Sequence, residues 1–322
     1  MKPKMYHTSW DGRLHRIFHS IVSKKRHSRK FPKLPTTIEP DHNRFGIAIA
    51  IIVKNEARFM GEWIAFHCML GVRHVYVYDN MSEDDLQGAI EQSGYGSRVT
   101  IIPWGRVHLR QQNLAYNHCV ASFGAQYRWM GFLDADEFVF PLHSQSLVET
   151  FERFEDQPCV ALPWHMFGTS GHNKSPDGFV IENFTLREQF PPEGNAKVVW
   201  KIFADPCKVK RAGIHSADLV GFGDVNFTQT GLMFDRYCRR DLELCKCEHL
   251  KLHHYYTRSK ADFETKIRKG SVATAGTKDR TAILRRRFKQ IEQNPIEDLD
   301  AVRFVESLKR SKINSPSARP AE

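Results

Sequence analysis

Long apolar segments are missing from this sequence. No run approaches the roughly 18 consecutive apolar residues that a membrane-spanning helix requires, and the N-terminus has no apolar core of the kind found in signal peptides. The seven cysteines are an odd number spread from Cys68 to Cys247, which does not suit a disulfide framework. These absences predict a cytoplasmic protein with reduced thiols.

Acidic residues are scarce at the N-terminus, where Asp11 is the single acid before Pro35. In this basic arm, residues 1–42, apolar side chains recur at helical spacing among lysines and arginines. The arm therefore predicts an amphipathic helix on an anionic membrane surface, with a peripheral location on the inner face of the membrane. The alternatives are a helix docked on the domain and a partly disordered arm.

The net charge of +10 favours polyanionic partners, namely nucleic acid, an anionic membrane or phosphate-rich small molecules. The basic residues concentrate at the two ends of the chain, and no nucleic-acid recognition motif is present. We therefore expect no nucleic acid partner. Cys238, Cys245, Cys247 and His249 carry donors suited to zinc, but their spacing is unusual for a zinc site, so incidental thiols are the favoured interpretation.

From residue 43 onward, strand-like and helix-like segments alternate. The predicted strands are 45–53, 74–78, 99–103 and 129–133, and the predicted helices are 58–70, 85–92 and 111–123. This alternation is typical of an α/β fold with a mostly parallel central sheet flanked by helices and with ligands at the carboxyl ends of the strands. Two apolar stripes, 283–291 and 296–308, predict a helical C-terminal extension over 276–322 that ends in a disordered tail.

Three carboxylates follow the fourth predicted strand, at Asp134, Asp136 and Glu137. In extended backbone Asp134 and Asp136 point to the same side, so both can reach one hard divalent ion, Mg2+ or Mn2+, beside a phosphate-bearing ligand. The alternative is a solvated turn, because Asp is common in turns. Lys54-Asn55-Glu56 and Asp79-Asn80 end the first two strands, and we expect all three polar clusters to meet in one crevice.

Short motifs occur in a consistent order between Gly46 and Gly270. They are Val53-Lys54-Asn55-Glu56, Glu62-Trp63-Ile64, His67, Gly71-Val72, Tyr78-Asp79-Asn80, Ser82, Asp84, Trp104, Gln111-Gln112, Ala115-Tyr116, Cys119, residues 132–138, Trp164, residues 167–171, Lys201, His215, His254-Tyr255, Arg258-Ser259, Phe263 and Lys266. This order resembles glycosyltransferase family 92 and related family 2-like bacterial transferases. The resemblance implies a Rossmann-like GT-A fold over residues 43–275 and transfer of a sugar, expected to be a hexose, from a nucleotide-sugar donor.

The resemblance also implies partners and a third metal ligand. A UDP-sugar is the favoured donor, with UDP-galactose as one candidate, and the acceptor is a glycan, polysaccharide or glycolipid. His254 is implied as a metal ligand beside Asp134 and Asp136. Adjacent histidines in a strand point in opposite directions, and His253 stands where the family commonly has Asn. A structural role for His254 is the alternative.

The nucleotide is expected over the first two strand ends. Backbone groups near Val53 suit the base, and Glu56, Asp79, Asn80 and Gln112 are candidate contacts to the ribose, base or donor. Their alternatives are pairing of Glu56 with Arg58, shaping of the turn by Asn80, and helix capping or solvent exposure for Gln112. Arg258 and Lys266, together with Arg268, are suited to a diphosphate, with an exposed basic helix as the alternative.

The resemblance favours inversion at the anomeric carbon, which requires one carboxylate as general base. The candidates are Asp177, Glu182, Glu188 and Glu137, and the sequence does not choose among them, although Glu137 is favoured as a structural partner. The leading hypothesis is a metal-dependent glycosyltransferase of polysaccharide or glycan biosynthesis. A non-catalytic basic binding protein for an anionic polymer is the alternative, and a metal-dependent phosphohydrolase is a weaker third.

Overall fold

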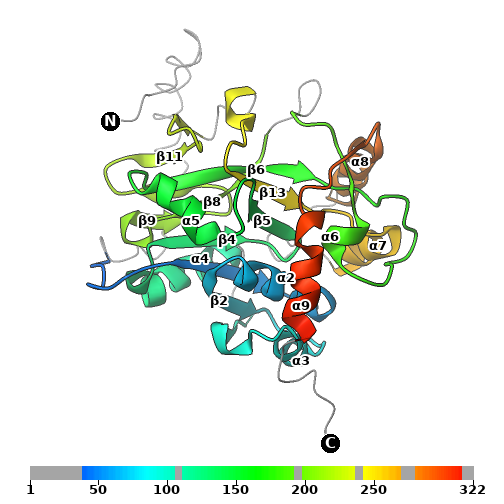
Figure 1. Ribbon diagram of the computed structural model, residues 1–322, viewed down its shortest axis with the longest axis horizontal. Coiled ribbons are helices and arrows are strands. Elements are labelled where there is room, and N and C mark those ends of the chain that lie inside the picture. Colours follow the sequence, from blue (N-terminus) through cyan, green and yellow to red (C-terminus); the bar gives the residue numbers. More distant parts are fainter. Residues whose placement is uncertain (1–37, 106–110, 192–197, 236–241, 270–279, 314–322) are drawn as a thin grey trace, which may run out of the picture.

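The computed structural model describes residues 38–105, 111–191, 198–235, 242–269 and 280–313 (Figure 1). The predicted amphipathic helix of the N-terminal arm and the predicted disordered tail lie outside these ranges, so both stay predictions. No helix within the ranges is long and apolar enough to cross a membrane.

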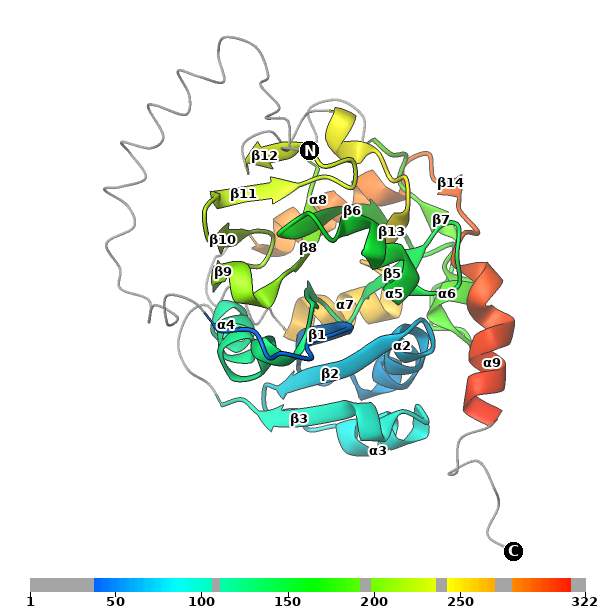
Figure 2. The same ribbon diagram turned by 60° about the vertical axis from the view of Figure 1, so that its left-hand side comes forward.

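Eight strands form the central sheet, in the order β3-β2-β1-β4-β8-β6-β13-β5 (Figure 2). Their bounds are β1 Ile47–Val53, β2 Val72–Asp79, β3 Val99–Pro103, β4 Trp129–Leu133, β5 Glu137–Pro141, β6 Cys159–Met166, β8 Trp200–Ala204 and β13 Leu250–His254. Strands β3, β2, β1 and β4 pair in parallel, as the alternation predicted. The pairs β4–β8, β8–β6 and β13–β5 are antiparallel, so the second half makes the sheet mixed.

Helices cover both faces of the sheet (Figures 1 and 2). The α-helices are α2 Ala57–Met69, α3 Leu86–Gln92, α4 Gln111–Phe123, α5 Leu147–Phe151, α6 Val180–Asn183, α7 Lys260–Lys269, α8 Arg280–Glu292 and α9 Val305–Ile313. Alternate residues of β1 belong to different cores. Ile49 lies in the core that includes residues of α2 and α9, whereas Ala48 and Ala50 lie in the core that includes residues of α4. Both faces of β1 are therefore buried, which explains why the strand reads as an unbroken apolar run.

Smaller elements complete the fold. A four-stranded antiparallel sheet contains β9 Val209–Ala212, β10 Ala217–Leu219, β11 Gly223–Phe227 and β12 Met233–Asp235, and β7 Leu186–Arg187 pairs with β14 Ile296–Glu297. The 3-10 helices are η1 Gly96–Arg98, η2 Gly124–Gln126, η3 Glu152–Phe154, η4 Pro206–Lys208, η5 Leu242–Cys245 and η6 Val302–Phe304.

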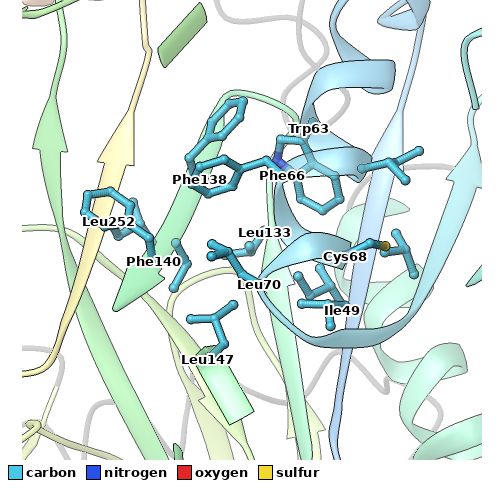
Figure 3. Packing of buried hydrophobic residues seen from close by; sticks show 14 of the residues in the cluster. Ile49, Trp63, Phe66, Cys68, Leu70, Leu133, Phe138, Phe140, Leu147 and Leu252 are labelled. Atoms are coloured by element: carbon cyan, nitrogen blue, oxygen red, sulfur yellow. The ribbon is translucent and has the colours of Figure 1, made fainter. Parts of the chain in front are cut away.

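Aromatic side chains join α2 to β5 in the larger core (Figure 3). The rings of Phe66 and Phe138 meet edge to face, with centroids 5.2 Å apart. His67, which belongs to the motif series, is fully buried: its Nδ1 lies 2.8 Å from the Trp63 carbonyl and its Nε2 accepts from Val139 N at 3.2 Å. Burial lowers the pKa of His67 to about 3, so the ring is neutral and holds α2 on β5.

The predicted helical stripe over residues 296–308 is helical only in its second half. Ile296 and Glu297 form a short strand, and α9 begins at Val305. Asp298 accounts for the difference, because its carboxylate pairs with Lys251 Nζ and with Arg187 Nε, each at 2.5 Å. These ion pairs tie the segment to β13 and β7, which a hydrophobic pattern cannot show.

Candidate active site

Residues 134–137 connect β4 to the start of β5 and contain the three carboxylates. This segment, the acidic turn, is held in place by neighbouring elements. The Glu137 carboxylate is fully buried and accepts a hydrogen bond from Asp134 N at 2.8 Å. Trp63 Nε1 donates to the Glu137 carbonyl at 2.7 Å, and Tyr255 N donates to the Asp136 carbonyl at 2.8 Å. Contacts from α2 and from the end of β13 therefore fix the backbone on which Asp134 and Asp136 stand.

The Asp134 carboxylate is bound by two side chains of the protein. Gln112 Nε2 donates to its Oδ1 at 2.5 Å, and Lys201 Nζ lies 2.9 Å from its Oδ2. Lys201 is completely buried in β8 and lies 3.4 Å from Glu137 Oε2 as well. Burial lowers the pKa of Lys201, but the two carboxylates outweigh burial and raise it, so the ammonium is charged.

The Asp136 carboxylate faces β13 and α7. Its Oδ2 lies 2.7 Å from Lys266 Nζ, and its Oδ1 lies 3.4 Å from Nε2 of the buried His254. Burial raises the pKa of Asp136, yet Lys266 and His254 outweigh burial and bring the pKa well below its usual value. His254 Nδ1 lies 4.0 Å from Glu137 Oε1, which places a carboxylate behind the ring.

Asp136 and His254 fit a divalent metal ion. Adjacent oxygen or nitrogen ligands of such an ion lie on the order of 3 Å apart, close to the observed 3.4 Å between Oδ1 and Nε2. In the described part of the chain, no three His, Cys, Asp or Glu donors converge as a ready-made metal site. The reason is visible at Asp134, whose oxygens are turned towards Gln112 and Lys201. Of the three predicted metal ligands, Asp136 and His254 face each other, whereas the Asp134 carboxylate is bound to other side chains.

The two adjacent histidines of β13 point in opposite directions, as the strand alternation predicted. His253 Nε2 lies 3.4 Å from Asp298 Oδ1, and its Nδ1 lies 3.2 Å from the Tyr255 hydroxyl. Burial lowers the pKa of His253 to about 4, against the opposing effect of Asp298. His253 is therefore one of the side chains that hold Asp298, and with it the C-terminal segment, against the sheet.

Glu56 and Arg258 meet, although they are 202 positions apart. Arg258 donates from Nη1 to Glu56 Oε2 at 3.0 Å and from Nη2 to the Ala135 carbonyl at 2.8 Å, and its guanidinium lies 3.5 Å from the Phe59 ring centroid. Glu56 thus forms an ion pair with Arg258, whereas Arg58 Nη1 lies 3.9 Å from Asp262 Oδ1. Arg258 thus links the end of β1 to the acidic turn.

The ends of β1 and β2 are adjacent, as expected. Val53 pairs with Asp79, and Asn80 N donates to the Val53 carbonyl at 2.8 Å. The Asp79 carboxylate accepts from Ser82 N at 2.9 Å and so shapes the turn. Asn80 Oδ1 is buried and accepts no hydrogen bond from any residue that the structure describes. Such an unpartnered buried acceptor can take a hydrogen bond from a water molecule or from a ligand.

The four candidate bases do not gather in one place. Glu137 is buried in the acidic turn, and Glu188 is held by Arg287 through contacts of 2.8 and 2.5 Å. Glu182 lies 3.5 Å from Lys309 on the surface. Asp177 is exposed and lines a cavity of about 220 Å³ together with Phe59 and other residues at the start of α2. Its position beside this cavity therefore separates Asp177 from the other three.

Sequence reasoning missed Lys201 as a site residue. The signal was present, because a lone Lys within the otherwise apolar strand Trp200–Ala204 needs a buried partner. The sequence pattern could not show that the partners of Lys201 are Asp134 and Glu137. Cys238 of the zinc alternative lies outside the described residues, so that alternative is not tested.

The sequence model described as glycosyltransferase family 92 matches residues 43–293. The chain belongs to this family. A family 92 protein of Oryza sativa subsp. japonica is 27% identical over 187 residues, covering 53% of this chain and 31% of its own length. One of Arabidopsis thaliana is 27% identical over 198 residues, covering 53% of this chain and 34% of its own length. The family 92 chain thus matches about a third of each relative's length.

Solved structures show partial likeness to this family 92 chain. The mannosyltransferase PcManGT from Pyrobaculum calidifontis, solved with GDP-Man and Mn2+, has a TM-score of 0.30 and 18% identity, covering 46% of this chain and 43% of its own. TarS of S. aureus with UDP has a TM-score of 0.31 and 12% identity, covering 50% and 47%. Family membership and the parallel β3-β2-β1-β4 arrangement confirm the predicted α/β fold of GT-A type.

Proposed function

We propose that this protein is a metal-dependent glycosyltransferase that moves a hexose from a nucleoside diphosphate donor to a glycan, polysaccharide or glycolipid. The observation that carries the proposal is the facing pair Asp136 and His254 beside Asp134, at the carboxyl end of β4. Mn2+ or Mg2+ would be held by this pair, with Asp134 as a further ligand once it turns from Lys201. A UDP-sugar is the favoured donor, with UDP-galactose as one candidate.

The metal, when bound, would neutralise the charge that grows on the diphosphate as the sugar bond breaks. The chain's own cations act at the same place. Arg258 is fixed against the acidic turn, and Lys266 stands beside Asp136. Asn80 Oδ1 and the backbone near Val53 would form hydrogen bonds with the base and ribose of the donor. Asp79 and Glu56 lie near these groups. Gln112 would act indirectly, by orienting Asp134.

The test measures the melting temperature of the protein at increasing concentrations of nucleotide. We expect UDP to raise the melting temperature with Mn2+ or Mg2+ and to have little effect with EDTA, since a ligand at 100 times its Kd stabilises by about 2.7 kcal/mol. UMP, which lacks the diphosphate, is the matched control and should stabilise less. A binding protein for anionic polymers would instead respond to heparin and ignore metal. The transferase proposal fails if neither UDP nor GDP stabilises at millimolar concentration.

For the mechanism we propose direct displacement with inversion, and Asp177 as the general base. A base must reach the acceptor hydroxyl. Asp177 is exposed and lines a cavity, whereas Glu188 and Glu182 are paired with cations and Glu137 is buried. We expect Asp177→Asn to lower turnover at least about a hundredfold and to leave UDP affinity unchanged. Isothermal titration measures the second quantity, and NMR of the product gives the anomeric configuration. A retained anomeric configuration contradicts the displacement.

A further inference from the structure

Among the described residues, three cations contact the acidic turn, and their side chains differ in exposure to solvent. Lys201 has a fully buried side chain between Asp134 and Glu137. Arg258 is 8% exposed and is fixed by two hydrogen bonds and an aromatic ring. The Lys266 side chain, by contrast, is 35% exposed although its ammonium touches Asp136. Of these three, Lys266 is the cation that combines a site contact with access to solvent.

The ammonium of Lys266 has protein neighbours, but its side chain is open to solvent, unlike that of Arg258. Its Nζ lies 2.7 Å from Asp136 Oδ2, 2.9 Å from the Tyr256 carbonyl and 4.2 Å from the Tyr256 ring centroid. The first turn of α7 is anchored separately, because the Asp262 carboxylate accepts from Ser259 N and Oγ. A lysine ammonium on its four-carbon stem can therefore change partners while the helix stays in place.

One carboxylate is shared by two kinds of partner. Asp136 offers Oδ1 towards His254 and Oδ2 to Lys266. A dication between Asp136 and His254 would come within a few ångströms of the ammonium and be repelled by it. A diphosphate bound to that dication would instead attract the ammonium.

We infer that Lys266 is an exchangeable counter-ion, which competes with the metal for Asp136 and passes to the donor diphosphate when metal and nucleotide bind together. This inference rests on the proposed function and adds a consequence to it. Without nucleotide, the metal binds weakly because it must displace the Lys266 ammonium from Asp136 or bind against its repulsion. Nucleotide removes that penalty, so each ligand strengthens the binding of the other by the same factor.

Lys266→Met tests the inference, because it must change the two affinities in opposite directions. Without nucleotide, Mn2+ should bind the variant about tenfold more tightly than the wild type, as measured from free Mn2+ by electron paramagnetic resonance. With saturating Mn2+, UDP should bind about tenfold more weakly in isothermal titration. Lys260→Met is the matched control, since Lys260 is an exposed lysine at the start of the same helix. It should leave both affinities within about twofold.

Unchanged or weaker Mn2+ binding in Lys266→Met overturns the inference, because Lys266 would then be a bystander or a support of the site. Lys266→Gln, which removes the charge but keeps a hydrogen-bond donor, gives a second reading if the Met variant does not fold, and the same directions are expected. The proposed function fails in a different way, namely when the wild-type protein binds neither Mn2+ nor UDP. The two failures are therefore distinguishable.

Discussion

Asp136→Asn is expected to lower sugar transfer by at least about a thousandfold while the protein stays folded. The amide keeps the shape of the side chain, but it removes the negative charge that faces His254 and Lys266. A neutral amide is a weak ligand for a hard divalent ion. Initial rates with a UDP-sugar give the loss of activity, and the melting temperature shows that the fold remains.

The control for this variant is Asp156→Asn, an exposed Asp outside the acidic turn. It makes the same chemical change and should retain wild-type activity and stability, since surface substitutions usually stay within about 0.5 kcal/mol. If Asp136→Asn keeps most of its activity, the assignment of the metal to Asp136 is wrong. If the variant is unfolded, the main role of the Asp136 carboxylate is to stabilise the fold.

Lys201→Met should have the largest effect on stability, a loss of about 3–5 kcal/mol in the free energy of unfolding. The reason is that Lys201 is buried at 2.9 Å from Asp134 and 3.4 Å from Glu137, so its removal leaves two carboxylates without their cation. Urea unfolding measures the change. Lys208→Met, at an exposed lysine of η4, is the control and should cost less than about 0.5 kcal/mol.

A second variant tests the cause of that loss. Adding Glu137→Gln to Lys201→Met removes one of the two stranded carboxylates, so the double variant should recover part of the lost stability, at least about 1 kcal/mol. A loss below about 1 kcal/mol in Lys201→Met, or an additive further loss in the double variant, would show that the buried charges are not coupled.

The parts of the fold that follow from local pattern were predictable. The run Ile47–Val53 is apolar at every position because the strand is covered on both faces, and the chain order of strand and helix up to β4 follows from periodicity alone. The acidic turn was also predictable as a position, since carboxylates placed directly after a buried strand emerge at its carboxyl end.

The contacts between distant segments were not predictable from pattern. Strand β8 enters the sheet between β4 and β6, and only this placement brings Lys201 under Asp134. Arg258 reaches Glu56 and Ala135 from a loop much later in the chain. Asp298 interrupts an apolar stripe because Lys251 and Arg187 need a buried carboxylate. Each case includes a charge pairing between segments far apart in the chain, which a local sequence pattern does not contain.

The position of β13 has a consequence for how the protein is made. This strand lies between β6 and β5, which precede it in the chain, and its Lys251 pairs with Asp298 and Asp300 later still. The ribosome therefore releases β5 and β6 before the strand that lies between them. Strand β13, which presents His254 to Asp136, can join β5 and β6 only after synthesis has passed residue 254, and pairings between segments so far apart in the chain slow folding.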